Sequence, residues 1–144
     1  PRSLRSYGSM TYAGFKSLIH AGLTEDDPRV KAAFNWIRTH YTFDENPGVG
    51  QQGLYYYYLA MARALRASQQ PIIIDSDGVS HDWRAELVQA LLERQREDGS
   101  WINLQDRWME GNDELVTVYA VLTLEELLKP APLARLRRTD TTAP

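Results

Sequence analysis

The sequence contains no cysteine in its 144 residues. Disulfide bonds and thiolate metal ligands are therefore excluded within this chain. Its three histidines, His20, His40 and His81, are too widely separated to form a metal-ligand spacing motif. We therefore predict no metal site and no cofactor.

Other chemical signatures are missing as well. The sequence shows no glycine-rich phosphate loop and no Ser/His/Asp motif. Its net charge is −3, with acidic and basic residues interspersed, which argues against a nucleic-acid interface. No apolar run is long enough to span a membrane. A cysteine-free composition fits reducing and oxidising compartments alike, so the localisation stays unknown.

The composition that remains is typical of a globular domain, with 43% hydrophobic and 24% charged residues. The length predicts one domain over residues 1–129. A Pro-Ala-Pro sequence at 130–132 ends the last predicted helix, and a basic and then threonine-rich tail follows. We predict that residues 130–144 are disordered. Because the chain begins with Pro1 rather than Met, we expect it to be a segment of a longer protein.

Apolar residues recur at helical spacing in five stretches. The predicted helices run from Ser9 or Thr11 to Ala21, Pro28 to His40, Gly53 to Ala67, Trp83 to Arg94 and Asp113 to Leu128. Between the third and fourth, a β-branched run followed by an Asp-Ser-Asp-Gly turn predicts a small β-hairpin near 72–80. The sequence therefore predicts an all-α fold with one small hairpin insert.

The predicted helices alternate in polarity. Those at 53–67 and 113–128 are apolar on nearly all sides, whereas those at 28–40 and 83–94 carry one apolar stripe each. A helix that is apolar all round needs neighbours on several sides, while a one-sided helix can face water. The alternation predicts helical hairpins in two layers, with the helix from Ser9 as the first inner one.

The most distinctive motif ends the fourth helix. Gly99 can take a positive φ, and the side chains of Asp98 and Ser100 can bond their own backbone, as in a turn. We expect Gln95 in the last helical turn, with its amide bonded to the free carbonyls there. Trp101 should be buried over the end of the helix.

This motif, Gln95, Asp98, Gly99 and Trp101 after an apolar helix, resembles the glutamine–tryptophan repeat of the terpenoid cyclase and protein prenyltransferase superfamily. That superfamily includes squalene–hopene cyclase-like proteins with the prenyltransferase and squalene oxidase repeat. The resemblance implies an α/α toroid, a ring of helical hairpins. A complete ring needs more hairpins than this chain has, so it implies a partial toroid, completed by the parent chain or by a partner.

The reactive sites of that superfamily have no clear counterpart here. Its cyclases use an Asp-x-Asp-Asp signature, whereas Asp75-Ser76-Asp77 is followed by Gly78 and is better explained as a turn. Its prenyltransferases hold zinc with Asp, Cys and His, and a thioester toroid also needs cysteine, which is absent. We expect His40 to be a helix-end residue and His81 a loop or cap residue.

Aromatic residues are the remaining candidates for a site. The tyrosines at 55–58 can line an aromatic cavity or simply fill the core. Because consecutive helical residues point about 100° apart, only one or two of the four can face a cavity. The predicted binding residues of a concave aromatic face are Tyr12, Tyr55, Tyr56, Trp108 and Asp113.

Two functions stay open. The favoured one is a module that binds a small hydrophobic ligand, a peptide or a protein partner on the concave face. The alternative is a cyclase-type or prenyltransferase-type enzyme acting on an isoprenoid, with its catalytic residues outside this segment. Because an incomplete ring exposes apolar flanks, we also expect self-association or contact with the remainder of the parent chain.

Overall fold

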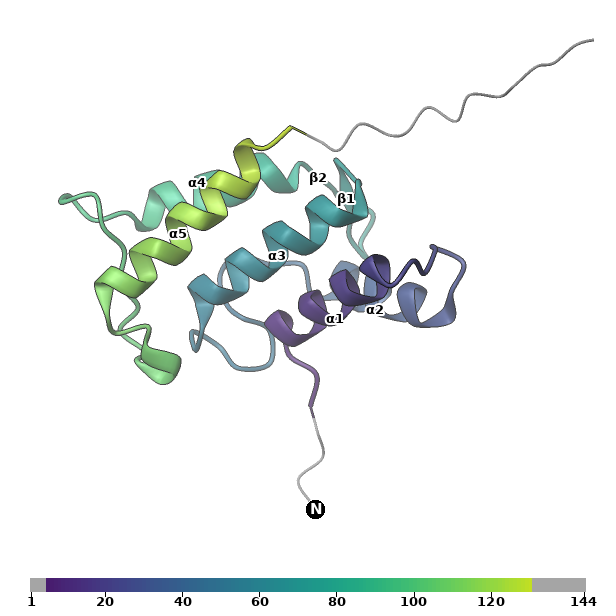
Figure 1. The fold of residues 1–144 in the computed structure, drawn as a ribbon, viewed down its shortest axis with the longest axis horizontal. Coiled ribbons are helices and arrows are strands. Elements are labelled where there is room, and N and C mark those ends of the chain that lie inside the picture. The colour runs from purple at the N-terminus through teal and green to yellow at the C-terminus, as the bar shows by residue number, and fades with distance from the viewer. Residues whose placement is uncertain (1–4, 131–144) are drawn as a thin grey trace, which may run out of the picture.

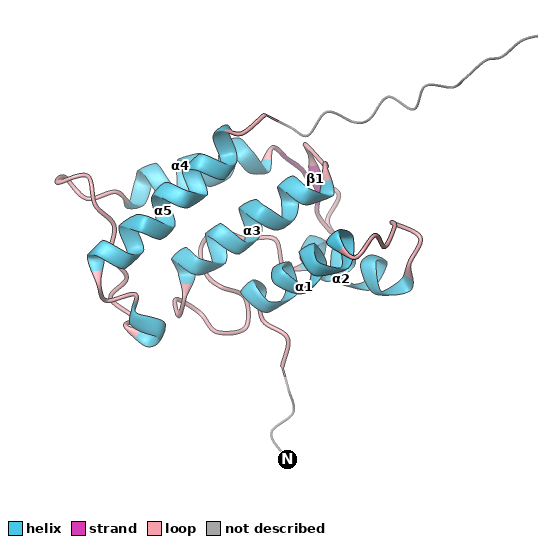
Figure 2. Cartoon of the chain, viewed as in Figure 1, coloured by secondary structure: helices cyan, strands magenta, loops and turns pink. Residues whose placement is uncertain are grey.

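The computed structural model describes residues 5–130 and consists mainly of α-helices (Figures 1 and 2). Apart from Pro130, the predicted tail at 130–144 lies outside the described residues. Along the described part, the elements are α1 (Gly8–His20), α2 (Pro28–Thr39), α3 (Leu54–Ser68), β1 (Ile73–Ile74), β2 (Ser80–His81), α4 (Trp83–Arg94), the 3-10 helix η1 (Arg107–Met109) and α5 (Asp113–Leu128). The two strands pair antiparallel. The predicted helical class with one small hairpin is confirmed.

Three helices begin where their capping residues predict. Asp27, Asp82 and Asn112 each accept a backbone N–H hydrogen bond in the first turn of α2, α4 and α5 respectively. Pro28 occupies the first helical position of α2, where its missing N–H costs nothing. These starts are encoded locally.

The start of α1 differs from the prediction. Neither Ser9 nor Thr11 caps this helix, which begins at Gly8 without a side-chain cap of its own. Instead, the side-chain oxygen of the buried Asn46 accepts a hydrogen bond from the backbone N–H of Ser9 at 3.1 Å. The carbonyl of Pro47 accepts one from the N–H of Gly8 at 2.8 Å. The capping side chain lies 37 positions away in the sequence, so no local motif predicts it.

The helices are arranged around α3 (Figure 1). α3 packs against α1 on one side and α5 on the other, while α2 packs against α1 and α4 against α5. The colours in Figure 1 show that α1, α3 and α5 run in one direction and that α2 and α4 run in the other. The first turns of α1, α3 and α5 therefore lie at the same end of the molecule.

α3 is buried on most of its surface, as predicted. Nine of its 15 residues are buried, and only Tyr56 and Arg63 are exposed. The hydroxyls of Tyr57 and Tyr58 are satisfied by another segment, because they donate to the backbone carbonyls of Thr42 and Phe43. The tyrosine run thus supplies both apolar area and anchors for the loop after α2.

α5 is less buried than predicted. Its buried residues form one stripe, Val116, Ala120, Thr123 and Leu127. On the opposite side, Val118, Val121 and Leu128 are exposed by 52%, 51% and 83%. The prediction of burial on most sides is wrong for this helix, because α5 lies at the edge of the molecule and no described element covers its outer side.

α4 carries the predicted single stripe with one difference. Leu87 and Leu91 are fully buried, but Leu92 is 54% exposed. Trp83 and Ala90 contribute to the buried side instead. The sequence predicts a stripe of Leu87, Val88, Leu91 and Leu92, so the observed stripe is rotated slightly from the predicted one.

The motif after α4 forms the expected turn with a tryptophan over the helix end. Trp101 is 3% exposed, and its indole N–H donates to the carbonyl of Leu91 at 2.8 Å. Gly99 has a φ of +86°, and Asp98 accepts a hydrogen bond from the N–H of Ser100. Gln95 differs from the prediction: it lies just after the helix, and its amide donates to the carbonyl of Gly99 at 2.9 Å.

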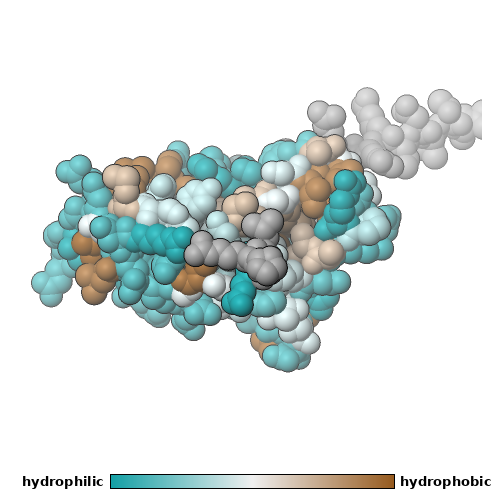
Figure 3. All heavy atoms as spheres, turned by 90° about the horizontal axis from the view of Figure 1, so that it is seen from below, coloured by the Kyte–Doolittle hydropathy of each residue, from teal (hydrophilic) through white to brown (hydrophobic). Residues whose placement is uncertain are grey.

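The surface seen from below is mostly hydrophilic, with separate hydrophobic patches (Figure 3). Among the described residues, no helix has both the length and the apolar character that a membrane crossing requires.

Candidate functional site

The five predicted binding residues do not meet in one cavity. Tyr12 and Tyr55 are only 1% and 4% exposed, so both belong to the core. Burial raises the pKa of the Tyr12 hydroxyl far above its ordinary value. The Tyr12 ring packs edge-on against Tyr57, with the ring centroids 5.7 Å apart.

Tyr56 is the one tyrosine of the 55–58 run that reaches the surface, with 46% of it exposed. Its ring lies 5.9 Å from the ring of Tyr119 on α5, in an edge-to-face arrangement. Tyr119 is partly buried against the core. This aromatic pair joins α3 and α5 at the surface.

Trp108 lies at the end of the molecule where α3 begins. It is 46% exposed and stacks on Tyr7 at 6.2 Å, with the Arg107 guanidinium 4.8 Å from its ring centre. A Cβ atom on Gly53 would come within 2.7 Å of the Trp108 ring, so only glycine fits there. Trp108 and Met109 both have positive φ, of 59° and 66°, which is a strained conformation for such residues.

Asp113 is exposed and accepts a hydrogen bond from Arg96 at 2.8 Å. This contact links the turn after α4 to the start of α5. Tyr56, Trp108 and Asp113 thus all reach the surface, but they lie on separate elements and line neither of the two hollows described below.

A buried carboxylate that sequence reasoning missed caps α3. Glu110 has no exposed surface. Its Oε1 accepts hydrogen bonds from the Tyr55 N–H at 3.0 Å and from the Asn103 amide at 3.1 Å, and its Oε2 accepts one from the Tyr56 N–H at 3.1 Å. The carboxylate thereby satisfies two free N–H groups and lies at the positive end of the helix dipole.

The only local signal for this arrangement is the residue before α3. Gly53 occupies the N-cap position in the left-handed conformation and offers no side chain to cap the helix. The acceptor comes from Glu110, which lies 55 positions from the donor Tyr55. The free N–H groups at all three helix starts at this end therefore donate to protein side chains. The acceptors are Asn46 for α1, Glu110 for α3 and Asn112 for α5. An external anion would have to displace them.

His81 forms a second polar cluster. Its Nε2 lies 2.8 Å from a carboxylate oxygen of Asp75, and its Nδ1 lies 2.9 Å from one of Glu86. The Tyr41 hydroxyl donates to the other oxygen of Glu86 at 2.7 Å, and its ring lies 4.2 Å from the imidazole. The cluster therefore ties the hairpin to α4 and to the segment after α2.

The electrostatics of this cluster favour a charged imidazole. Burial lowers the pKa of His81, but the hydrogen bonds to Asp75 and Glu86 outweigh burial and leave the pKa raised. The hydrogen bond with His81 lowers the pKa of Asp75. In the protonated ring each nitrogen carries a hydrogen and faces a carboxylate, so the ring has no lone pair to act as a base. The geometry is that of a structural link.

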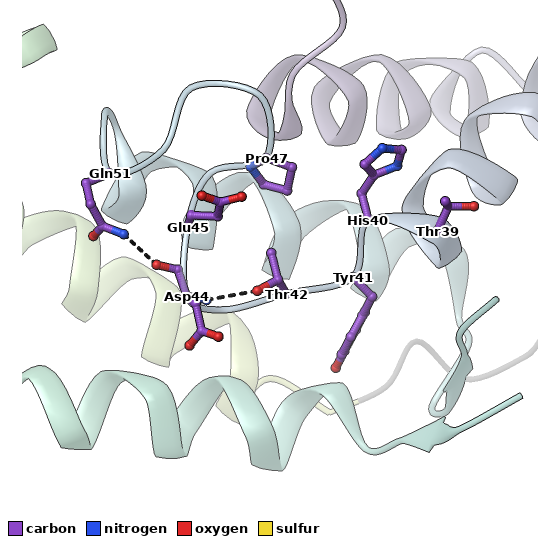
Figure 4. A pocket seen from close by; sticks show the side chains of 8 residues that line it. All are labelled: Thr39, His40, Tyr41, Thr42, Asp44, Glu45, Pro47 and Gln51. Atoms are coloured by element: carbon purple, nitrogen blue, oxygen red, sulfur yellow. Dashed lines mark hydrogen bonds between the residues drawn. The ribbon is translucent and has the colours of Figure 1, made fainter. Parts of the chain in front are cut away.

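An open polar cleft of about 570 Å³ follows α2 (Figure 4). Its lining residues are Thr39, His40, Tyr41, Thr42, Asp44, Glu45, Pro47 and Gln51. Figure 4 shows His40 and Tyr41 pointing in opposite directions, so the Tyr41 hydroxyl leaves the cleft for Glu86. His40 stacks on Trp36 at 4.1 Å and contacts its carbonyl through Nδ1, as expected of a helix-end residue.

A larger groove of about 900 Å³ lies between α1, the first two turns of α2 and the end of α3; we call it the α1–α2–α3 groove. Its apolar lining comprises Phe15, Ile19, Leu23, Val30 and Phe34. Its polar rim comprises Thr24, Glu25, Asp26, Lys31, Asn35 and residues 67–70 at the end of α3. The sequence did not predict this groove, because the end of α3 reaches the α1–α2 connection only in the folded chain.

Over residues 5–130, no group of three His, Asp or Glu side chains is arranged to hold a metal ion. Comparisons with protein-family models, curated proteins and solved structures give no match to this chain. Its function has to be inferred from its own surfaces.

Proposed function

We propose that this chain is a helical-repeat module that binds a protein partner with the outer side of α5 and catalyses no reaction itself. The observation that carries the proposal is the exposure of Val118, Val121 and Leu128 on one side of an otherwise apolar helix. Contiguous exposed apolar residues mark association surfaces on folded domains.

The proposed surface, the α5 face, consists of Glu114, Val118, Val121, Glu125 and Leu128. Their spacing of three or four residues places them on one side of the helix. All five are exposed. The partly buried pair of Leu115 and Leu122 widens the face beyond this stripe. The face therefore carries three apolar side chains and two carboxylates, with Glu125 between Val121 and Leu128.

The arrangement of helices supports the proposal of a partial α/α toroid. α3 has a parallel neighbour on each side, whereas α5 has α3 on one side and no described helix beyond it. In a ring of hairpins, the next inner helix would cover the α5 face. That helix would come from the parent chain or from another molecule.

A second copy of this chain is the partner that can be tested directly. Antiparallel pairing of two α5 helices would bring the apolar residues together around Val121 and oppose the helix dipoles. It would also place Glu114 of one copy near Lys129 at the end of the other α5, which adds an attraction between opposite charges.

The test is light scattering over a range of protein concentrations. We expect the wild-type mass to rise toward that of a dimer and Val121→Asp to stay monomeric, because a buried carboxylate is costly at an apolar contact. The matched control is Val79→Asp, since Val79 is equally exposed, at 52%, in the hairpin turn. A wild-type protein that stays monomeric at high concentration would count against the proposal.

A further inference from the structure

We propose that the α1–α2–α3 groove binds a small organic cation, an ammonium group attached to an apolar body. The groove is separate from the α5 face, so this site stands independently of the partner proposed above. Three features carry the proposal: the apolar floor, the charge on the rim and the carbonyl end of α3.

The floor is apolar and partly aromatic. Phe15 and Val30, which are only 3% and 5% exposed, belong to its lining. Phe34 stacks on Phe15 with the ring centroids 5.8 Å apart and the planes 23° from parallel. The volume of about 900 Å³ falls within the range of small-molecule sites. An alkyl or aryl body of modest size would be removed from water here.

The rim carries more negative than positive charge. Two carboxylates, Glu25 and Asp26, stand against one ammonium, Lys31, which leaves one net negative charge. Lys31 lies 3.9 Å from Asp26, whose side chain is 98% exposed, so this ion pair is loose and open to competition. Glu25 is held toward the end of α3, because the Gln70 amide donates to it at 3.3 Å.

The end of α3 adds a second source of negative potential. Ala67 would receive a helical hydrogen bond from residue 71, but Pro71 has no N–H to give. Within residues 5–130, neither the Ala67 carbonyl nor the Ser68 carbonyl accepts a hydrogen bond. Free carbonyls at a helix end carry partial negative charge and attract cations.

The positive end of α2 also reaches this rim, but it is already occupied. The Asp27 carboxylate caps it by accepting from the Arg29 N–H at 2.9 Å. The groove therefore combines an apolar floor, where a ring face can also attract a cation, with a mouth of negative potential. An apolar anion would bury the same surface but meet repulsion at the rim.

The experiment compares three probes that share one tail: octylammonium, octanol and octanoate. Each is titrated into the 15N-labelled protein, and amide shifts are followed by NMR. We expect octylammonium to bind with a Kd about tenfold or more below that of octanoate, with octanol between them. The shifted amides should be those of the groove, including Ile19, Leu23 and Gln69. Added salt should weaken only the binding of octylammonium.

Variants locate the charge that matters. Asp26→Asn should weaken octylammonium binding about threefold to tenfold and leave octanol binding unchanged. Lys31→Gln should strengthen octylammonium binding. The matched control is Asp77→Asn, at an exposed aspartate in the hairpin turn, which should change the binding of neither octylammonium nor octanol. The proposal would be overturned if octylammonium did not bind, or if octanoate bound as tightly as octylammonium. It would also be overturned if Asp26→Asn left octylammonium binding unchanged, or if the shifted amides lay outside the groove.

Discussion

At the scale of single residues, Glu110 and Trp101 each join segments that lie apart in the sequence. Glu110 brings the loop before α5 to the start of α3 through three accepted hydrogen bonds. Trp101 returns to the end of α4 and donates to Leu91. Both side chains are buried. Loss of Trp101 would leave a cavity, and loss of Glu110 would leave buried N–H groups without acceptors, which is costly.

Replacing Trp101 by alanine should lower the free energy of unfolding by about 3–5 kcal/mol, as for other large core aromatic residues. Urea denaturation of the wild type and the variant measures this directly. Trp108→Ala is the matched control, because Trp108 is half exposed and should cost less. A loss below about 1 kcal/mol for Trp101→Ala would show that the ring does not close the helix end.

Replacing Glu110 by glutamine keeps the shape but turns one acceptor oxygen into a donor. All three partners of Glu110 are N–H donors, so the new amide must oppose at least one of them. We expect a loss of about 2–3 kcal/mol in the free energy of unfolding. Glu114→Gln, at an exposed position nearby, should change it by no more than about 0.5 kcal/mol. If the two variants lowered the free energy of unfolding equally, the buried hydrogen bonds of Glu110 would not have the stabilising role described.

The His81 cluster predicts a pH dependence. The folded-state pKa of His81 is above its ordinary value of 6.5, so its contribution is complete below 6.5 and is lost as the pH rises through the folded value. The folded-state pKa of Asp75 is below 3.8, so its contribution is present above 3.8 and is lost as the pH falls through the folded value. The cluster therefore stabilises most between about pH 4 and 6.5.

We expect His81→Gln to cost most within that window and least near pH 9, when the free energy of unfolding is measured by urea denaturation at several pH values. His20→Gln serves as the control, because His20 is exposed at the end of α1. A cost of His81→Gln that does not change with pH would contradict the ionic description of the cluster.

The same residues show what the sequence can and cannot predict. Asp27 and Asp82 cap their helices within three positions of themselves, and Trp101 donates to a carbonyl ten positions back, so the nearby sequence indicates their roles. Asn46 and Glu110 act over 37 and 55 positions, and nothing in their local sequence names the partner. Tyr12 and Tyr55 are predicted to lie on a binding face but lie in the core. The sequence pattern of an aromatic residue on an apolar helix does not distinguish a core position from one at a cavity.

At the scale of elements, α3 and α5 have similar apolar character but different surroundings. α3 is covered by α1 on one side and by α5 on the other. α5 is covered on its inner side alone and exposes Val118, Val121 and Leu128. An apolar pattern states how many sides a helix is able to bury. It does not state how many of those sides this chain itself covers.

The carboxylates on the α5 face lead to a prediction for this element. Glu125 lies between Val121 and Leu128 on the exposed stripe and would oppose close packing there. Glu125→Leu should therefore strengthen self-association at least several-fold, as measured by sedimentation equilibrium. Glu93→Leu, an exposed change on α4, should have no such effect. Weaker association of Glu125→Leu would place the contact elsewhere.

At the scale of the whole molecule, the chain has two different sides around α3. The α1 and α2 side holds the α1–α2–α3 groove, with an apolar floor and a negative rim. The α5 side ends in an uncovered apolar helix. The first turns of the three parallel helices are closed by protein side chains, and the two surfaces proposed for binding, the groove and the α5 face, lie away from them.

The most direct measurement of the central claim is an NMR titration of the valine methyl groups against protein concentration. If the α5 face binds another molecule of the chain, the methyl signals of Val118 and Val121 should shift and broaden as the concentration rises. Those of Val79 in the hairpin and Val88 on α4 should stay unchanged in the same spectra. Constant positions for Val118 and Val121, or shifts confined to Val79 and Val88, would contradict the account.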